Sequence, residues 1–248
     1  RGALFMVDLK NEVQKRGFTV AHIKTDSIKI PNATPEIIEV VMNFGKKYGY
    51  TFEHEATYEK MCLVNDAVYI AKYKNGDWTA TGAQFAVPYV FKTLFSHEPI
   101  EFKDLCETKT VTSALYLDMN EGLPEGEHDY HFVGKVGLFC PIVPGNGGGE
   151  LLRESGDNKY AYATGAKGYR WMESEMVQFL GKEETIDISY YRTLVDAAVA
   201  EISKYGDFEW FVSDDPVTEI RPNFMNIPEG YEESGVPFEE YNLLKEKQ

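Results

Sequence analysis

The chain has 248 residues, and its 43% hydrophobic and 26% charged content is the ordinary balance of a globular protein. The formal net charge of −15 argues against a general electrostatic grip on nucleic acid, which needs a basic face, and leaves only a local basic groove open. No apolar run approaches the roughly 20 residues of a membrane span, and no signal peptide is visible.

The first 50 residues predict a helix, a β-hairpin and a second helix, at residues 3–16, 18–30 and 35–48. Apolar residues recur at helical spacing in both helices, and Gly17 and Gly49 follow them as stop signals. Thr34 is expected to cap the second helix, with Pro35 in its first turn. The hairpin consists of two β-type runs on either side of a tight polar turn.

The rest of the chain reads mainly as strands. Residues 50–94 predict a strand at 50–55 and then a meander with strands at 60–64, 67–74 and 78–80, in which Asn75-Gly76 is the strongest hairpin signal. Further strands are expected at 114–117, 130–140, 151–153, 159–164 and 169–172. An amphipathic helix follows at about 189–205.

This order of elements predicts an α+β fold class. We divide the chain into a helix, hairpin and meander region at 1–95, a β-rich region with one long helix at 96–213, and an irregular acidic tail at 214–248. The run Gly-Asn-Gly-Gly-Gly at 145–149 is interpreted as a loop between strands, because it lacks the Gly-Lys-Ser/Thr ending of a nucleotide-binding loop.

Three cysteines, Cys62, Cys106 and Cys140, lie far apart in the sequence and are odd in number. They form no Cys-x-x-Cys pair, so the sequence predicts neither a disulfide framework nor a zinc site. A reducing compartment is the simple interpretation.

The hairpin at 19–30 is the most informative segment, because its turn carries one carboxylate, Asp26. A strand–turn–strand hairpin holds such a carboxylate rigidly at its tip, and rigid, exposed carboxylates suit a hard divalent metal. Taken alone, a Thr-Asp-Ser turn has an ordinary explanation, because these residues favour turns. The sequence on either side of this turn supports a functional interpretation.

The segment Lys-Thr-Asp-Ser-Ile at 24–28 resembles the Asp-Thr-Asp-Ser hairpin of family B DNA polymerases, with Lys24 where the family usually has its first aspartate. The family's order of helix, hairpin, helix, glutamate-bearing strand and tyrosine-bearing hairpin is repeated here over about residues 3–94. The run at 63–72 looks like the primer-gripping Lys-Lys-Arg-Tyr segment, with its tyrosine at Tyr69. The three basic positions before it are Asp66, Ala67 and Val68 here.

The resemblance implies the second half of a palm domain, most similar to phage-type members. Family thumb domains are often helical, so the β-rich region in the thumb position departs from the family. The missing half, including an earlier aspartate motif, would lie before Arg1, which is not a methionine. The chain is therefore expected to be a fragment that is inactive alone, from a phage or prophage protein in the cytoplasm of a bacterial host.

In such a polymerase, two Mg²⁺ ions clamp the attacking and leaving oxygens during nucleotidyl transfer. The resemblance implies that Asp26 is the catalytic metal ligand, and that primer–template DNA and a dNTP are the partners. The residues expected to support the site are Lys24, Thr25, Ser27 and Glu55. Tyr69 and Lys72 would contact the primer backbone.

Two alternatives stay open at this point. A metal-dependent nuclease would use Asp26, Glu53 and Glu55 as a carboxylate cluster. A non-catalytic nucleic-acid-binding or structural module would make Lys24 the mark of a dead site, and the charge of −15 favours this somewhat. The aromatic and basic residues at 160–171 suit strand stacking in principle, but a buried β core with a hairpin at 165–168 is the preferred interpretation.

Overall fold

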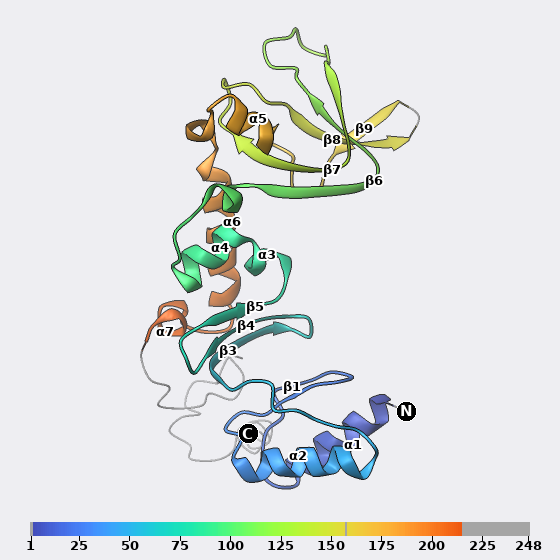
Figure 1. Ribbon diagram of the computed structural model, residues 1–248, viewed down its shortest axis with the longest axis vertical. Coiled ribbons are helices and arrows are strands. Elements are labelled where there is room, and N and C mark those ends of the chain that lie inside the picture. Colours follow the sequence, from blue (N-terminus) through green and yellow to red (C-terminus); the bar gives the residue numbers. More distant parts are fainter. Residues whose placement is uncertain (1, 157, 215–248) are drawn as a thin grey trace, which may run out of the picture. The chain divides into compact units, whose positions relative to one another are not determined.

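The computed structural model describes residues 2–156 and 158–214, and it has a mixed α+β fold with antiparallel sheets, which confirms the expected fold class (Figure 1). The chain separates into two units. The first unit comprises the residues up to Gly82 and those from Val199 on, and the second unit is Ala83–Ala198. The segment 83–95, grouped above with the first 95 residues, therefore belongs to the second unit. Residues 215–248, nearly all of the predicted acidic tail, lie outside the described residues.

Two helices and a short hairpin open the first unit: α1 (Gly2–Gln14), β1 (His22–Ile23), β2 (Ile28–Lys29) and α2 (Pro35–Lys47). Both helices follow the sequence prediction closely. Thr34 caps α2 as expected, because its hydroxyl accepts a hydrogen bond from the Ile37 amide at 3.4 Å. The helices share one apolar core, to which α1 contributes Leu9 and Val13 and α2 contributes Ile37 and Val41.

The first unit continues as a three-stranded antiparallel sheet in the order β3 (Tyr58–Asn65), β4 (Val68–Tyr73), β5 (Trp78–Ala80). The predicted Asn75-Gly76 hairpin joins β4 to β5, and Gly76 has a φ of +93°, which a residue with a side chain adopts only with strain. Residues 207–214 return to this unit. There α7 (Phe208–Val212) places the Phe211 ring edge-on to Trp78, at 5.4 Å between centroids.

The strand predicted at 50–55 is wrong, because residues 51–57 have no regular secondary structure. The apparent alternation has a different cause. Phe52 packs into the helix core, with its ring centroid 6.0 Å from that of Phe5, while Glu53, His54 and Glu55 are all exposed. A single aromatic residue that packs into the helix core, among polar neighbours, therefore produced an alternating pattern that resembles a strand.

The second unit is built on a curled five-stranded antiparallel sheet in the order β10-β7-β6-β8-β9 (Figure 1). The strands are β6 (Glu107–Asp118), β7 (Tyr130–Ile142), β8 (Glu150–Gly156), β9 (Lys159–Tyr162) and β10 (Arg170–Glu173). All five overlap the strands predicted from the sequence. Leu115, Phe139, Leu151 and Trp171 are fully buried in the core on one face of this sheet.

Helices complete the second unit. Those before the sheet are α3 (Ala83–Ala86), α4 (Pro88–Phe91), a π-helix (Lys92–Ser96) and a 3₁₀ helix (Phe102–Leu105). Those after it are α5 (Ser174–Phe179), a 3₁₀ turn (Glu183–Thr185) and α6 (Ile188–Ser203), the long helix predicted from the sequence, which runs across the division at Ala198. Tyr190 and Tyr191 of α6 join the core of the sheet.

The helix core of the first unit gives a matched test of packing. Leu9 is fully buried on α1, whereas Leu4 of the same helix is 68% exposed. We expect Leu9→Ala to lower the free energy of unfolding by about 2–5 kcal/mol, because it removes buried methyl groups and leaves a cavity. Leu4→Ala should change it by less than about 0.5 kcal/mol. Urea denaturation of both variants measures this, and equal effects would contradict the core assignment.

Candidate functional site

Asp26 lies in the turn of the β1–β2 hairpin and is exposed. The Lys24 amide donates to the Ser27 carbonyl at 2.8 Å and closes the turn, and His22 pairs with Lys29 in the strands. Lys24 and Thr25 are exposed, and Ser27 is half-buried. The hairpin predicted from the sequence is therefore present, with each strand only two residues long, and it presents the Asp26 carboxylate to solvent.

A buried histidine fixes the hairpin to the three-stranded sheet. His22 is 5% exposed, and its Nε2 lies 3.0 Å from the backbone carbonyl oxygen of Asp66, 44 residues away in the β3–β4 turn. Because a carbonyl only accepts, Nε2 carries the proton and donates it. A second link comes from Lys29, whose Nζ lies 4.9 Å from the centroid of the Tyr69 ring. These two links hold the Asp26 turn near β4.

Lys29 is a site residue that the sequence analysis missed. Burial lowers the pKa of its ammonium group, and the positive charge of Lys24 lowers it further, while Glu55 and Asp26 act in the opposite direction. The charged side chains of the hairpin and of Glu55 therefore all act on the Lys29 ammonium group. No local sequence pattern indicates this role, because it depends on Tyr69 of a distant strand as well as on the hairpin.

The structure separates the two residues expected to contact a primer. Tyr69 and Lys72 are three positions apart in β4, so their side chains leave opposite faces of the sheet. The Lys72 side chain is 7% exposed. Its Nζ donates to Asp214 at 2.7 Å and lies 3.9 Å from the Glu59 carboxylate. A phosphate contact by Lys72 therefore requires that it exchange a partner carboxylate, whereas Tyr69 lies on the side of Lys29.

The candidate metal ligand in this site is a single carboxylate, that of Asp26. Within residues 2–156 and 158–214, no group of three or more His, Cys, Asp or Glu side chains is placed to hold a metal ion, so Asp26, Glu53 and Glu55 do not form one. The exposed Asp26 carboxylate offers the oxygen ligands that Mg²⁺ prefers, with room for water in the remaining positions. Its role as a metal ligand stays a prediction.

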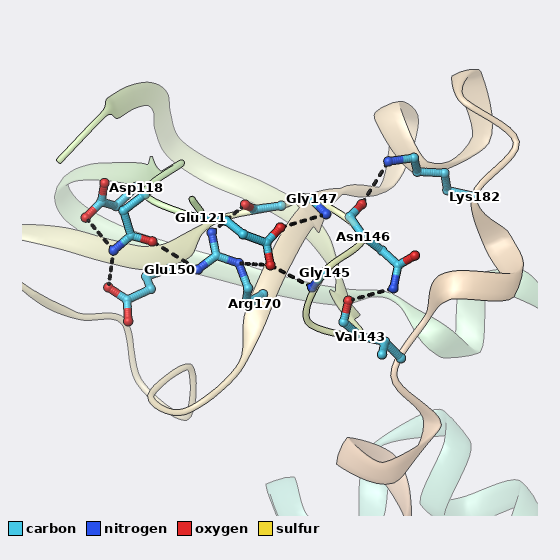
Figure 2. A network of polar contacts seen from close by, with 11 residues as sticks. Asp118, Glu121, Val143, Gly145, Asn146, Gly147, Glu150, Arg170 and Lys182 are labelled. Carbon is cyan, nitrogen blue, oxygen red and sulfur yellow. Dashed lines mark hydrogen bonds and ion pairs between the residues drawn. The ribbon is translucent and has the colours of Figure 1, made fainter. Parts of the chain in front are cut away.

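A second polar cluster surrounds the glycine-rich loop of the second unit (Figure 2). The Glu121 carboxylate accepts hydrogen bonds from the amides of Gly145 at 2.6 Å and Gly147 at 3.0 Å. Arg170 donates to the Gly148 carbonyl at 2.7 Å, and its Nε lies 3.8 Å from Glu121. The loop connects β7 to β8, as predicted, and its amides bind a carboxylate of the chain itself.

Close packing explains two of the glycines in this loop. A Cβ atom at Gly148 would lie 2.7 Å from the Trp171 carbonyl oxygen, and one at Gly149 would lie 2.8 Å from that of Asp118. Gly149 and Trp171 exchange two backbone hydrogen bonds of 2.7 and 2.8 Å across this contact. The glycine run is therefore a tightly packed connection.

Next to the loop, the fully buried Asp118 holds His128. The Asp118 carboxylate lies 2.7 Å from His128 Nδ1 and accepts a 2.9 Å hydrogen bond from the Asp129 amide. His131 instead lies 3.0 Å from the Asp129 carboxylate. The two histidines thus pair with different carboxylates.

Comparisons of the chain with known protein families, with curated proteins and with solved structures find no match. None of the helices in the described part of the chain has the length and apolar character needed to cross a membrane.

The electrostatics of the hairpin can be tested at Lys29. In a Lys24→Met variant we expect the pKa of Lys29 to rise toward its ordinary value, because a like charge is removed. In Asp26→Asn it should fall further, because a charge that favours the ammonium form is lost. NMR titration of the lysine side chains measures both, with Lys46→Met on α2 as the control. Shifts in the same direction for both hairpin variants would contradict this arrangement.

The glycine loop depends on the Glu121 carboxylate in this structure. We expect Glu121→Gln to lower the free energy of unfolding by about 0.5–1.5 kcal/mol, because an amide side chain has one acceptor oxygen for two solvent-exposed backbone donors. Glu125→Gln, at an exposed position of the same β6–β7 connection, should have little effect. Thermal or urea unfolding of the two variants measures the difference. A loss no larger than that of Glu125→Gln would show that the contact adds no stability.

Proposed function

We propose that this chain supplies the metal-binding hairpin of a family B type, DNA-directed DNA polymerase. The observation that carries the proposal is the exposed Asp26 carboxylate at the tip of a short hairpin that lies between two packed helices in the chain and is fixed to a three-stranded sheet. Helix, hairpin, helix and meander keep the order in which the sequence resembles the family, but the glutamate-bearing strand departs from it, because residues 51–57 have no regular secondary structure. The resemblance requires a second aspartate from an earlier motif that is not among the 248 residues.

The charge distribution supports a nucleotide or DNA site in this part of the chain. Residues 1–82 hold 11 lysines and arginines and 10 aspartates and glutamates, whereas residues 83–248 hold 14 and 30. The acidic surplus therefore lies outside residues 1–82 of the sequence, although part of it is in residues 199–248, which belong to the same unit as the hairpin. Lys24 and Lys29 flank Asp26 there, and their positive charges oppose the repulsion that a carboxylate exerts on a phosphate.

The residues divide the work in this proposal. Two bound Mg²⁺ ions would supply the charge neutralisation and the activated oxygen nucleophile for nucleotidyl transfer. Asp26 would hold metal with one or both carboxylate oxygens, and its backbone is fixed by the Lys24–Ser27 hydrogen bond. Lys24 would attract a phosphate of the incoming dNTP, in the place where the family has its first aspartate. The Lys24 side chain is exposed to solvent.

Tyr69 and Lys29 would position the primer strand. The Lys29 ammonium group lies over the Tyr69 ring, so the two side chains form one unit with a cationic and a phenolic end. Such contacts go to the phosphate backbone and hold its register without reading the sequence. Thr25 and Ser27 shape the turn, and Glu55 balances the charge at Lys29. An enzyme of this kind would act in the cytoplasm of a bacterium that carries the phage or prophage.

Metal binding tests the hairpin directly. We expect Mn²⁺ added to the chain to broaden the NMR signals of residues 24–28, because a paramagnetic ion bound at Asp26 relaxes nearby nuclei. Asp26→Asn should abolish this broadening, because it removes the charge of the ligand. Asp66→Asn, an exposed acid in another turn of the same unit, should leave it intact. Broadening that survives in Asp26→Asn would remove the basis of the proposal.

Activity gives the second test. The 248-residue chain should show no primer extension with Mg²⁺ and dNTPs, because one of the two metal-binding aspartates is not in it. A longer chain that includes the earlier aspartate motif should extend a primer, and Asp26→Asn in that chain should reduce the rate at least about a hundredfold. Cleavage of DNA by the 248-residue chain, lost in Asp26→Asn, would instead establish a nuclease.

A further inference from the structure

The sheet of the second unit has a second face that is rich in aromatic rings. Side chains directly opposite each other on neighbouring antiparallel strands share one face. Tyr116 is opposite Phe132 on β7 and opposite Leu152 on β8. By the same rule, four more pairs of opposite residues lie on this face of the sheet. They are Asp118–Tyr130, Asp118–Glu150, Leu152–Tyr162 and Glu154–Tyr160. Their neighbours Leu115, Leu117 and Leu151 point into the core on the opposite face.

The rings on this face contact one another. Tyr130 and Tyr160 are stacked with centroids 4.2 Å apart, and His128 stacks on Tyr130 at 5.0 Å. Tyr116 meets the rings of Phe132 and Tyr160 edge-on, at 5.6 and 5.2 Å. We call these residues, together with Tyr162, the ring face. Its members are Tyr116, His128, Tyr130, Phe132, Tyr160 and Tyr162.

Much of the ring face is open to solvent. Phe132 is 68% exposed, Tyr162 38% and Tyr130 37%. A single exposed aromatic residue needs no explanation, but a connected set of five rings with Tyr162 on the same sheet face is an apolar patch of the kind that marks an interaction site. The buried Asp118 holds the His128 ring in its stacked position, so the ring face is ordered before any partner binds.

Carboxylates lie beside several of the rings. Glu150 accepts a hydrogen bond from the Tyr162 hydroxyl at 3.1 Å, and Glu154 lies opposite Tyr160. The β6–β7 connection adds the exposed carboxylates of Glu125, Glu127 and Asp129. The hydrogen bond to Glu150 raises the pKa of Tyr162, and burial followed by the Asp118 charge raises that of Tyr130. The hydroxyl groups of Tyr130 and Tyr162 thus stay protonated and can donate hydrogen bonds next to these carboxylates.

One cation of the chain already occupies this kind of position. Lys167, in the β9–β10 connection, places its Nζ 5.8 Å from the centroid of the Tyr162 ring. The electron-rich face of an aromatic ring attracts a cation, and nearby carboxylates add to the attraction. A phosphate backbone has the opposite charge, and residues 83–198 carry 18 acidic against 10 basic residues. The charge of the surface therefore favours a cationic occupant over a nucleic acid strand.

We propose that the ring face binds an arginine-bearing segment of a partner protein. A guanidinium group is planar and weakly hydrated, so it stacks on tyrosine and phenylalanine rings while its N–H groups bond to carboxylates such as Glu154. This site lies in the second unit and uses none of the residues assigned to the polymerase site. The two proposals can therefore be tested independently of each other.

The experiment uses the full chain and a fluorescent peptide with six arginines separated by glycines, titrated at 0.15 M salt. Matched peptides contain lysine or glutamate in place of arginine, and a 12-nucleotide oligo-dT is the nucleic acid probe. We expect the arginine peptide to bind more tightly than the lysine peptide, and the glutamate peptide and oligo-dT not to bind. Phe132→Ala and Tyr130→Ala should each weaken binding of the arginine peptide about fivefold.

Phe179 provides the matched control, since it is 83% exposed on α5 of the same unit and is not part of the ring face. Phe179→Ala should leave the affinity unchanged, and Phe132→Trp should keep or raise it, because tryptophan is the best cation–π partner. Equal effects of Phe132→Ala and Phe179→Ala would reduce the binding to general charge attraction and overturn the proposal. Binding of oligo-dT in place of the arginine peptide, lost in Phe132→Ala, would overturn it in favour of a nucleic acid site.

Discussion

The hydrogen bond from the buried His22 imidazole to the Asp66 carbonyl is the contact on which the candidate site depends. The hairpin strands are two residues long, and so short a hairpin has little stability of its own in water. Its tip is held at a defined position because Ile23 and Ile28 pack against the helix core, His22 attaches one strand to the β3–β4 turn, and Lys29 attaches the other to Tyr69 of β4. The Asp26 carboxylate is thus presented by a turn that is held at its base.

Charge is unevenly distributed along this chain, and this distribution constrains which kind of partner each surface can bind. The segment that carries Asp26 is nearly neutral, while the rest of the chain holds the acidic surplus. Several carboxylates of that surplus already have partners within the chain, such as Glu121 on the glycine loop and Asp118 beside His128. At the ring face the half-buried Glu150 and Glu154 lie beside aromatic rings, and there the same charge favours the cationic partner that we propose.

The predictable part of the fold came from local signals. Helical spacing with Thr34 as a cap located α2, and Asn75-Gly76 located the β4–β5 hairpin, because both depend on residues within one or two turns of the chain. The strand predicted at 50–55 was wrong for the opposite reason. Phe52 is partly buried by contact with α1, and no local pattern indicates this contact. The same limit applies to the site, where Asp26 could be found from its turn, but Lys29 could not.

By itself, the sequence determined the α+β class, the position of Asp26 in a turn and the resemblance that suggests a polymerase, since each rests on spacing and residue type along a short stretch. The tertiary structure decided which side chains face the hairpin, that Lys72 is paired with Asp214, and that three strands, β6, β7 and β9, gather their rings on one exposed face. These features join residues from 44 to 142 positions apart in the first unit, or from several strands in the second. Only the folded chain brings such residues within contact distance, because strand register and side-chain burial are set by the packing of the whole unit.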